Sequence, residues 1–131
     1  MTSQVRTRLT LWNVDRPEEP IVATAVYSPA DPYAMRLSFP GLGEPWTFAR
    51  ALLAEGLEEP VGDGDVRIAP AEAEDWIEIV LFSGQPRECR LFAPRDQVTS
   101  FVDRCFRLVP LGREDEWIDW DRQIALIRGV A

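Results

Sequence analysis

The sequence contains no histidine, and because all 14 of its basic residues are arginine it contains no lysine either. Without histidine the chain cannot assemble Ser-His-Asp or Cys-His catalysis, or a zinc site with histidine ligands. Without lysine it cannot use Schiff-base chemistry or supply the phosphate-binding lysine of a P-loop. Any catalysis would therefore depend on carboxylates, or on hydroxyl groups without their usual base.

Cysteine and long apolar runs are also scarce. Cys89 and Cys105 are too few for a four-cysteine zinc or iron–sulfur site, and we expect two free thiols in the core. The longest apolar runs, such as Ile79–Phe82, are far too short to cross a membrane. The stretch Met1–Arg6 lacks the apolar segment of a signal peptide. We therefore expect a cytoplasmic protein with no direct insertion into a membrane.

Positive charge is in the minority, since 22 acidic residues face 14 arginines and the net charge is −8. An acidic chain repels phosphate backbones unless its arginines gather in one place. Along the sequence only three pairs lie close together: Arg6 with Arg8, Arg87 with Arg90, and Arg104 with Arg107. Nucleic acid is therefore a disfavoured partner. The length of 131 residues predicts one domain over residues 1–131.

Apolar and polar residues alternate strictly over Gln4–Trp12, which predicts a half-buried strand with Arg6, Arg8 and Trp12 on its outer side. The proline-rich stretch Asn13–Pro20 is typical of a hairpin loop. Similar patterns predict six further strands: Ile21–Tyr27, Tyr33–Phe39, Trp46–Phe48, Asp65–Ala69, Trp76–Phe82 and Arg87–Phe92.

Three segments have helical patterns. Ala49–Glu55 precedes Gly56, a residue typical of the position just after a helix. Pro94–Arg107 has the most regular apolar stripe, centred on Phe101. In Asp115–Arg128, with Asp119 or Asp115 as N-cap, we expect the stripe of Trp117, Trp120, Ile124 and Ile127 to pack in the core. Together the elements predict an α+β fold in which antiparallel sheets pack with about three helices.

Acidic residues gather near the C-terminus, in Glu114-Asp115-Glu116 and at Asp119 and Asp121. Such a cluster could hold a divalent ion or act as a catalytic carboxylate pair. Negative charge also favours the N-terminus of a helix, and we prefer this interpretation. We therefore expect no catalytic, cofactor or metal site. A hydrolase that uses carboxylates remains an alternative.

Three stretches, in order along the chain, resemble the signatures of the SsgA-like proteins, actinobacterial regulators of sporulation-specific cell division: Tyr27–Ala34, Trp46–Leu57 and Pro60–Pro70. The pattern Trp117-Ile118-Asp119-Trp120-Asp121 is similar as well. The resemblance covers nearly the whole chain. Ala51 departs from it, because an acidic residue is expected after the arginine.

The resemblance implies a bell-shaped homotrimer whose protomer is similar to the whirly-type nucleic-acid-binding fold. It implies no enzymatic activity and no cofactor. The implied role is to help position the septum, through contact with the tubulin-like FtsZ or with another SsgA-like protein at division septa. Because relatives of this fold bind single strands, a single-stranded nucleic-acid-binding module is the alternative.

Partner binding needs exposed aromatic or arginine anchors. We expect the core to take Phe101, Phe106, Trp120 and Ile124. The candidate residues for contact with a partner, or between protomers, are then Arg6, Arg8, Trp12 and Arg36.

Overall fold

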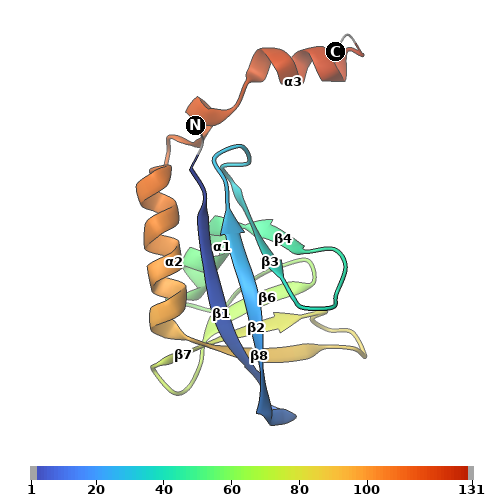
Figure 1. Cartoon of the computed structure of the whole chain (residues 1–131), viewed down its shortest axis with the longest axis vertical. Coiled ribbons are helices and arrows are strands. Elements are labelled where there is room, and N and C mark those ends of the chain that lie inside the picture. Colours follow the sequence, from blue (N-terminus) through green and yellow to red (C-terminus); the bar gives the residue numbers. More distant parts are fainter. Residues whose placement is uncertain (1–2, 130–131) are drawn as a thin grey trace.

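The computed structural model describes residues 3–129 and is built around an eight-stranded antiparallel sheet (Figure 1). The strand order is β4-β3-β2-β1-β8-β7-β6-β5. The predicted α+β class, with antiparallel pairing and three α-helices in the described part of the chain, is confirmed. The strands form one continuous sheet, because β1 pairs with β2 along its length and with β8 at Trp12 and Asn13.

The elements follow a repeated order of strands and then a helix. The first half contains β1 (Val5–Asn13), β2 (Arg16–Tyr27), β3 (Ala34–Ser38), β4 (Trp46–Ala49) and α1 (Arg50–Gly56). The second half contains β5 (Val61–Asp63), β6 (Val66–Pro70), β7 (Trp76–Leu81), β8 (Cys89–Pro94) and α2 (Arg95–Leu108). A 3₁₀ turn, η1 (Glu114–Trp117), and α3 (Trp120–Ile127) complete the described chain.

The predicted hairpin loop Asn13–Pro20 is mostly strand, since β2 begins at Arg16. The β1–β2 register shifts between Leu11 and Asn13, and such a bulge tolerates prolines that cannot donate ladder hydrogen bonds. Strand β5 was not predicted; it pairs with β6 through a turn in which Gly64 has a φ of 59°.

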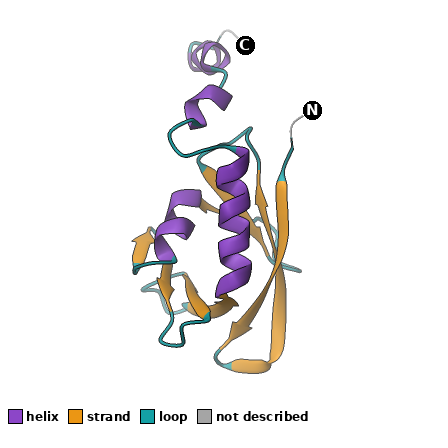
Figure 2. Cartoon of the chain, turned by 90° about the vertical axis from the view of Figure 1, so that its left-hand side faces the viewer, coloured by secondary structure: helices purple, strands orange, loops and turns teal. Residues whose placement is uncertain are grey.

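Helices α1 and α2 lie on the concave side of the bent sheet, where strands surround them (Figure 2). The predicted stripe of α2 is buried there, with Phe101 only 1% exposed. Both cysteines are free, as predicted; Cys105 is buried, and Cys89 is half-buried. Burial raises the pKa of the Cys105 thiol to about 12, although nearby arginines act in the opposite direction.

Gly56 does not have the left-handed conformation expected after a helix, because it is the last residue of α1 and its φ is not positive. A glycine is required there for a different reason. A Cβ at this position would lie 2.3 Å from Cγ2 of Ile68 on β6. The absent side chain therefore lets α1 pack closely against the sheet.

The single helix predicted over Asp115–Arg128 is also wrong, since Ile118 is extended and separates η1 from α3. Asp119 caps α3, as one of the two predicted N-caps: its carboxylate accepts a hydrogen bond from the Arg122 N–H at 3.0 Å. Across residues 3–129, no helix combines the length and the apolar character needed to cross a lipid bilayer.

Candidate interaction surfaces

The sheet brings Arg36 to the same face as Arg6 and Arg8, from which it is distant in sequence. Arg6 lies opposite Val26, which in turn lies opposite Arg36, so β1, β2 and β3 place both arginines on one face. Arg8 follows two residues later on β1 and points to the same side. All three side chains are exposed, and none forms an ion pair with another described residue. We call these three residues the arginine face.

Trp12 shares the side of β1 on which Arg6 and Arg8 lie, but it is not part of the arginine face. Four residues separate it from Arg8, which is about 13 Å along a strand. Its ring packs edge to face on that of Trp76, with the centroids 5.3 Å apart. The structure therefore divides the four predicted contact residues into two separate places, with Arg6, Arg8 and Arg36 in one and Trp12 in the other.

The C-terminal part of the chain presents an exposed apolar surface that the sequence analysis placed in the core. Trp120 is 53% exposed and Ile124 45%, so the prediction that both are buried is wrong. The physical reason is position: α3 extends past the end of the sheet, away from α1 and α2 (Figure 1). Its apolar stripe is left exposed, and three more large apolar side chains of this part of the chain are exposed as well: Trp117, Leu126 and Ile127. We call residues 114–127 the C-terminal arm.

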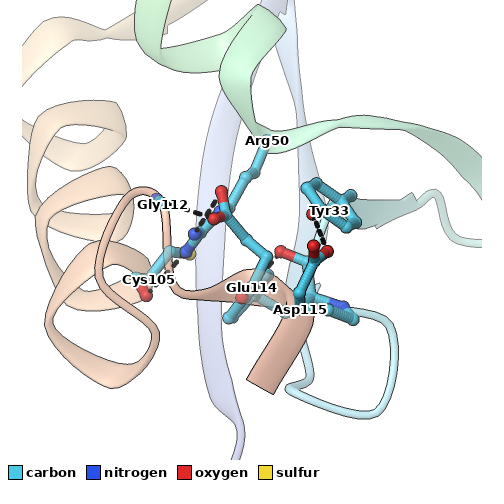
Figure 3. Close-up of polar contacts among 8 residues, drawn as sticks. Tyr33, Arg50, Cys105, Gly112, Glu114 and Asp115 are labelled. Atoms are coloured by element: carbon cyan, nitrogen blue, oxygen red, sulfur yellow. Dashed lines mark hydrogen bonds and ion pairs between the residues drawn. The ribbon is translucent and has the colours of Figure 1, made fainter. Parts of the chain in front are cut away.

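A buried ion pair joins this arm to the body (Figure 3). Arg50, the first residue of α1, is 3% exposed, and its Nη2 lies 3.2 Å from Oε2 of Glu114. Its Nη1 donates a hydrogen bond of 3.0 Å to the carbonyl oxygen of Cys105 on α2. The guanidinium also stacks over the rings of Phe106 and Tyr27, at 4.0 and 5.0 Å from their centroids. One side chain thus connects α1, α2 and the start of the arm.

The electrostatics of this connection favour a charged Glu114. Its own backbone N–H, the Arg50 guanidinium and the Gly112 N–H, which donates a hydrogen bond of 2.7 Å, favour the charged form and hold the pKa of the carboxyl below its usual value despite burial. Next to it, the Tyr33 hydroxyl donates a hydrogen bond to the Asp115 carboxylate, which raises the pKa of Tyr33. Tyr33 is exposed and ties the β2–β3 turn to the arm.

The acidic cluster does not converge on one point, because its members have separate partners. Glu114 pairs with Arg50, Asp115 with Tyr33, and Glu116 with Arg113 at 2.9 Å. Asp119 caps α3. Within residues 3–129, no group of three or more ligating side chains is arranged to hold a metal ion. Glu114, Asp115, Glu116 and Asp119 therefore have structural roles at the start of the arm, and Asp121 lies in the first turn of α3.

The sequence analysis missed Arg50 and Glu114 as a pair. They are 64 residues apart, and a buried arginine has no local pattern that separates it from an exposed one. One signal was available: Arg50 interrupts the Trp46–Leu53 stretch, where its neighbours Phe48, Leu52 and Leu53 are apolar and buried.

The chain is thus an α+β domain with an arginine face and an exposed apolar arm, which the Arg50–Glu114 ion pair joins to the body. Comparison with known proteins identifies its family. The family model described as "Streptomyces sporulation and cell division protein, SsgA" matches residues 21–114. The sporulation-specific cell division protein SsgB of Frankia casuarinae is 43% identical over 112 residues, which cover 82% of this chain and 78% of that protein. SsgB of Thermobifida fusca is 43% identical over 118 residues, which cover 85% of this chain and 83% of that protein.

Solved structures lead to the same family. One, from work titled "Mutations in SsgB correlate to longitudinal cell division during sporulation of Streptomyces coelicolor", has a TM-score of 0.77 and 38% identity, and the match covers 88% of this chain and 94% of that one. A crystal structure of an SsgA-like sporulation-specific cell division protein from Thermobifida fusca also has a TM-score of 0.77, at 34% identity. This match covers 95% of this chain and 94% of that one. This chain belongs to the SsgA family of sporulation and cell division proteins, which is not a known family of enzymes.

Proposed function

We propose that the protein is a non-enzymatic regulator of sporulation-specific cell division. It acts in the cytoplasm at division septa and helps to position the septum by contact with FtsZ or with another SsgA-like protein. Family membership supports the role in cell division, and the exposed arginine face and C-terminal arm support a mechanism based on protein contacts. In this proposal residues 1–131 form one domain, and each surface has its own partner.

The C-terminal arm is the proposed surface for self-association into a homotrimer. Its stripe exposes five large apolar side chains, which water-exposed helices of a monomer rarely carry together. Burying a tryptophan at an interface removes a large apolar area from water and gives such residues a dominant share of binding energy. The Arg50–Glu114 ion pair fixes the position from which the arm extends, so the stripe is held outward in a defined place.

The arginine face is the proposed surface for the division protein. Arg6, Arg8 and Arg36 are free of intramolecular ion pairs within the described chain, so partner carboxylates would meet them without first breaking a contact. FtsZ is acidic, and a positive patch on an otherwise acidic protein steers such a partner to one face. This observation carries the proposal of direct contact.

The test is a binding assay with purified FtsZ and, separately, with a second SsgA-like protein. We expect Arg6→Glu with Arg8→Glu to weaken binding at least about tenfold, because charge reversal places like charges against the partner. The matched control is Arg16→Glu with Arg67→Glu, which reverses two exposed arginines outside the arginine face and should leave binding unchanged. Equal loss in both variants would reflect net charge alone and contradict the proposal, and so would an absence of binding by the wild type to either protein.

Single-stranded nucleic acid is the second candidate partner, because three arginines do gather on one face. Two features of the protein disfavour nucleic acid as a partner. The remaining positions of the arginine face on β2 and β3 are Val22, Thr24, Val26 and Ser38, so the face offers no aromatic ring on which a base could stack. The net charge of −8 also opposes binding to phosphates. We expect a labelled oligonucleotide to show no micromolar, salt-sensitive binding in fluorescence anisotropy.

A further inference from the structure

A groove at the opposite end of β1 from the arginine face has no role in the function proposed above. Its floor consists of Trp12, Trp76 and Phe92, contributed by the neighbouring strands β1, β7 and β8. Pro17 and Pro70 line its sides, and its volume is about 860 Å³. All three rings are half-buried, so they form a wall that is both fixed by packing and open to a ligand. We call this the tryptophan groove.

The two tryptophans hold their rings at a right angle, with an interplanar angle of 89°. Neither indole N–H donates a hydrogen bond to another residue of the described chain, although both rings line the groove. A half-buried indole N–H normally finds an acceptor. Both indole N–H groups are without a partner among the described residues, in two rings that line the tryptophan groove.

The charges along the groove select the sign of that occupant. Glu78 is half-buried beside the rings, Glu72 lies at the edge, and neither is in an ion pair with a described residue. Arg90, the groove's arginine, lies 3.9 Å from Glu88 instead. A half-buried carboxylate without a cation favours a positively charged ligand group, and an indole face stabilises a guanidinium placed over it. The same carboxylates repel phosphates.

We propose that the tryptophan groove binds an extended, proline-containing peptide segment of a partner protein that carries an arginine. Polyproline II segments have solvated carbonyl oxygens that accept hydrogen bonds from indole N–H groups, and their rings fit between aromatic side chains. They also lose little conformational entropy when they bind. The arginine of the peptide segment pairs with Glu78, and the proline rings of the segment pack on Trp12 and Trp76.

The experiment is a titration of ¹⁵N-labelled protein with a peptide of eight prolines flanked by arginines, followed by NMR through the indole N–H signals. The chain has five tryptophans, so the signals of Trp46, Trp117 and Trp120 are internal references. We expect saturable shifts of the Trp12 and Trp76 signals only. We expect weaker binding of the same peptide flanked by glutamates, and no shifts with a glycine-serine peptide of equal length.

Four variants, one of them a control, sharpen the result while keeping an aromatic ring or the shape of each side chain. Trp12→Phe and Trp76→Phe remove one donor each and should weaken binding about three- to tenfold. Trp117→Phe, in the C-terminal arm, is the matched control and should have no effect. Glu78→Gln should weaken binding of the arginine-flanked peptide about two- to fivefold and leave an uncharged oligoproline unaffected. Backbone amide spectra verify the fold of each variant.

Several outcomes would overturn the proposal: no saturable shift at millimolar peptide, equal shifts with the glycine-serine peptide, or shifts confined to the Trp117 and Trp120 signals. Saturable binding of a single-stranded oligonucleotide to the same two indoles, tighter than that of the peptide, would also overturn it in favour of base stacking. Since none of these readouts involves FtsZ, the arginine face or the arm, their failure is separate from a failure of the proposed function.

Discussion

Helices α2 and α3 both carry an apolar stripe, yet the stripe of α2 is buried and that of α3 is exposed. In α2, Val98 and Phe101 face the concave side of the sheet and are almost completely inaccessible. In α3, which extends past the end of the sheet, Trp120 and Ile124 remain exposed. Periodicity identifies the apolar face of a helix, but the element that covers that face is a tertiary property. The exposed stripe on the capped helix α3 is the reason for proposing the arm as a surface for self-association.

The largest expected effect on the free energy of unfolding comes from a substitution in the body, not in the arm. Phe101→Ala should lower the free energy of unfolding by about 3–5 kcal/mol, because it leaves a cavity in the core under α2. Chemical denaturation followed by circular dichroism measures this loss. A midpoint close to that of the wild type would mean that α2 does not contribute the central core contact.

The next effect tests the connection between the two regions. Glu114→Ala should lower the free energy of unfolding by about 3 kcal/mol, because it leaves the guanidinium of Arg50 buried without its counter-charge. Glu116→Ala is the matched control: its pair with Arg113 is exposed, and its loss should cost less than about 1 kcal/mol. Similar costs for the two variants, measured by the same denaturation, would contradict a special role for the buried pair.

A pH titration examines the same connection without removing the side chain. The pKa of Glu114 is lower in the folded protein than its usual value near 4.5, so the unfolded chain binds more protons as the pH falls through this range. The contribution of Glu114 to the free energy of unfolding is therefore fully present above pH 4.5 and is lost as the pH falls through the pKa of Glu114 in the folded protein. Between neutral and acid pH, the free energy of unfolding should fall more for the wild type than for Glu114→Gln. Parallel curves of unfolding free energy against pH for the two proteins would refute this.

The smallest effect on folding should come from the arm itself. In dilute solution Trp120→Ala should change the free energy of unfolding by no more than about 0.5 kcal/mol, because the side chain is exposed. The wild-type Tm should rise with protein concentration, since association stabilises the folded state, and the variant should lose this dependence. Calorimetry at several concentrations gives both quantities. A large loss in dilute solution would place Trp120 in the core of the single chain.

Local patterns predicted much of the fold. Alternation located β1, β3 and β7, and the spacing of apolar residues located α2 together with its buried face. The errors have local causes as well. The prolines at positions 17 and 20 were taken as a loop, although a bulged strand accommodates them. Gly56 was interpreted through its backbone freedom, whereas its function is to make room for Ile68.

The interaction surfaces were harder to predict, because they arise from contacts that are distant in sequence. Arg6 and Arg8 were proposed from one strand, and only the pairing of β1, β2 and β3 shows that Arg36 joins them. Trp12 was placed on the same surface, but pairing with β8 draws it toward Trp76. The link between Arg50 and Glu114 has no signature in either segment, since an ion pair forms wherever the fold brings opposite charges together.

The central claim is that the C-terminal arm holds protomers together, and the mass of the protein in solution tests it most directly. Light scattering coupled to gel filtration should give the wild type three times the chain mass of 14.9 kDa. Trp120→Ala with Ile124→Ala should give the mass of one chain while the circular dichroism spectrum is unchanged. A wild type that is monomeric at micromolar concentration, or a folded double variant that keeps the wild-type mass, would contradict the account.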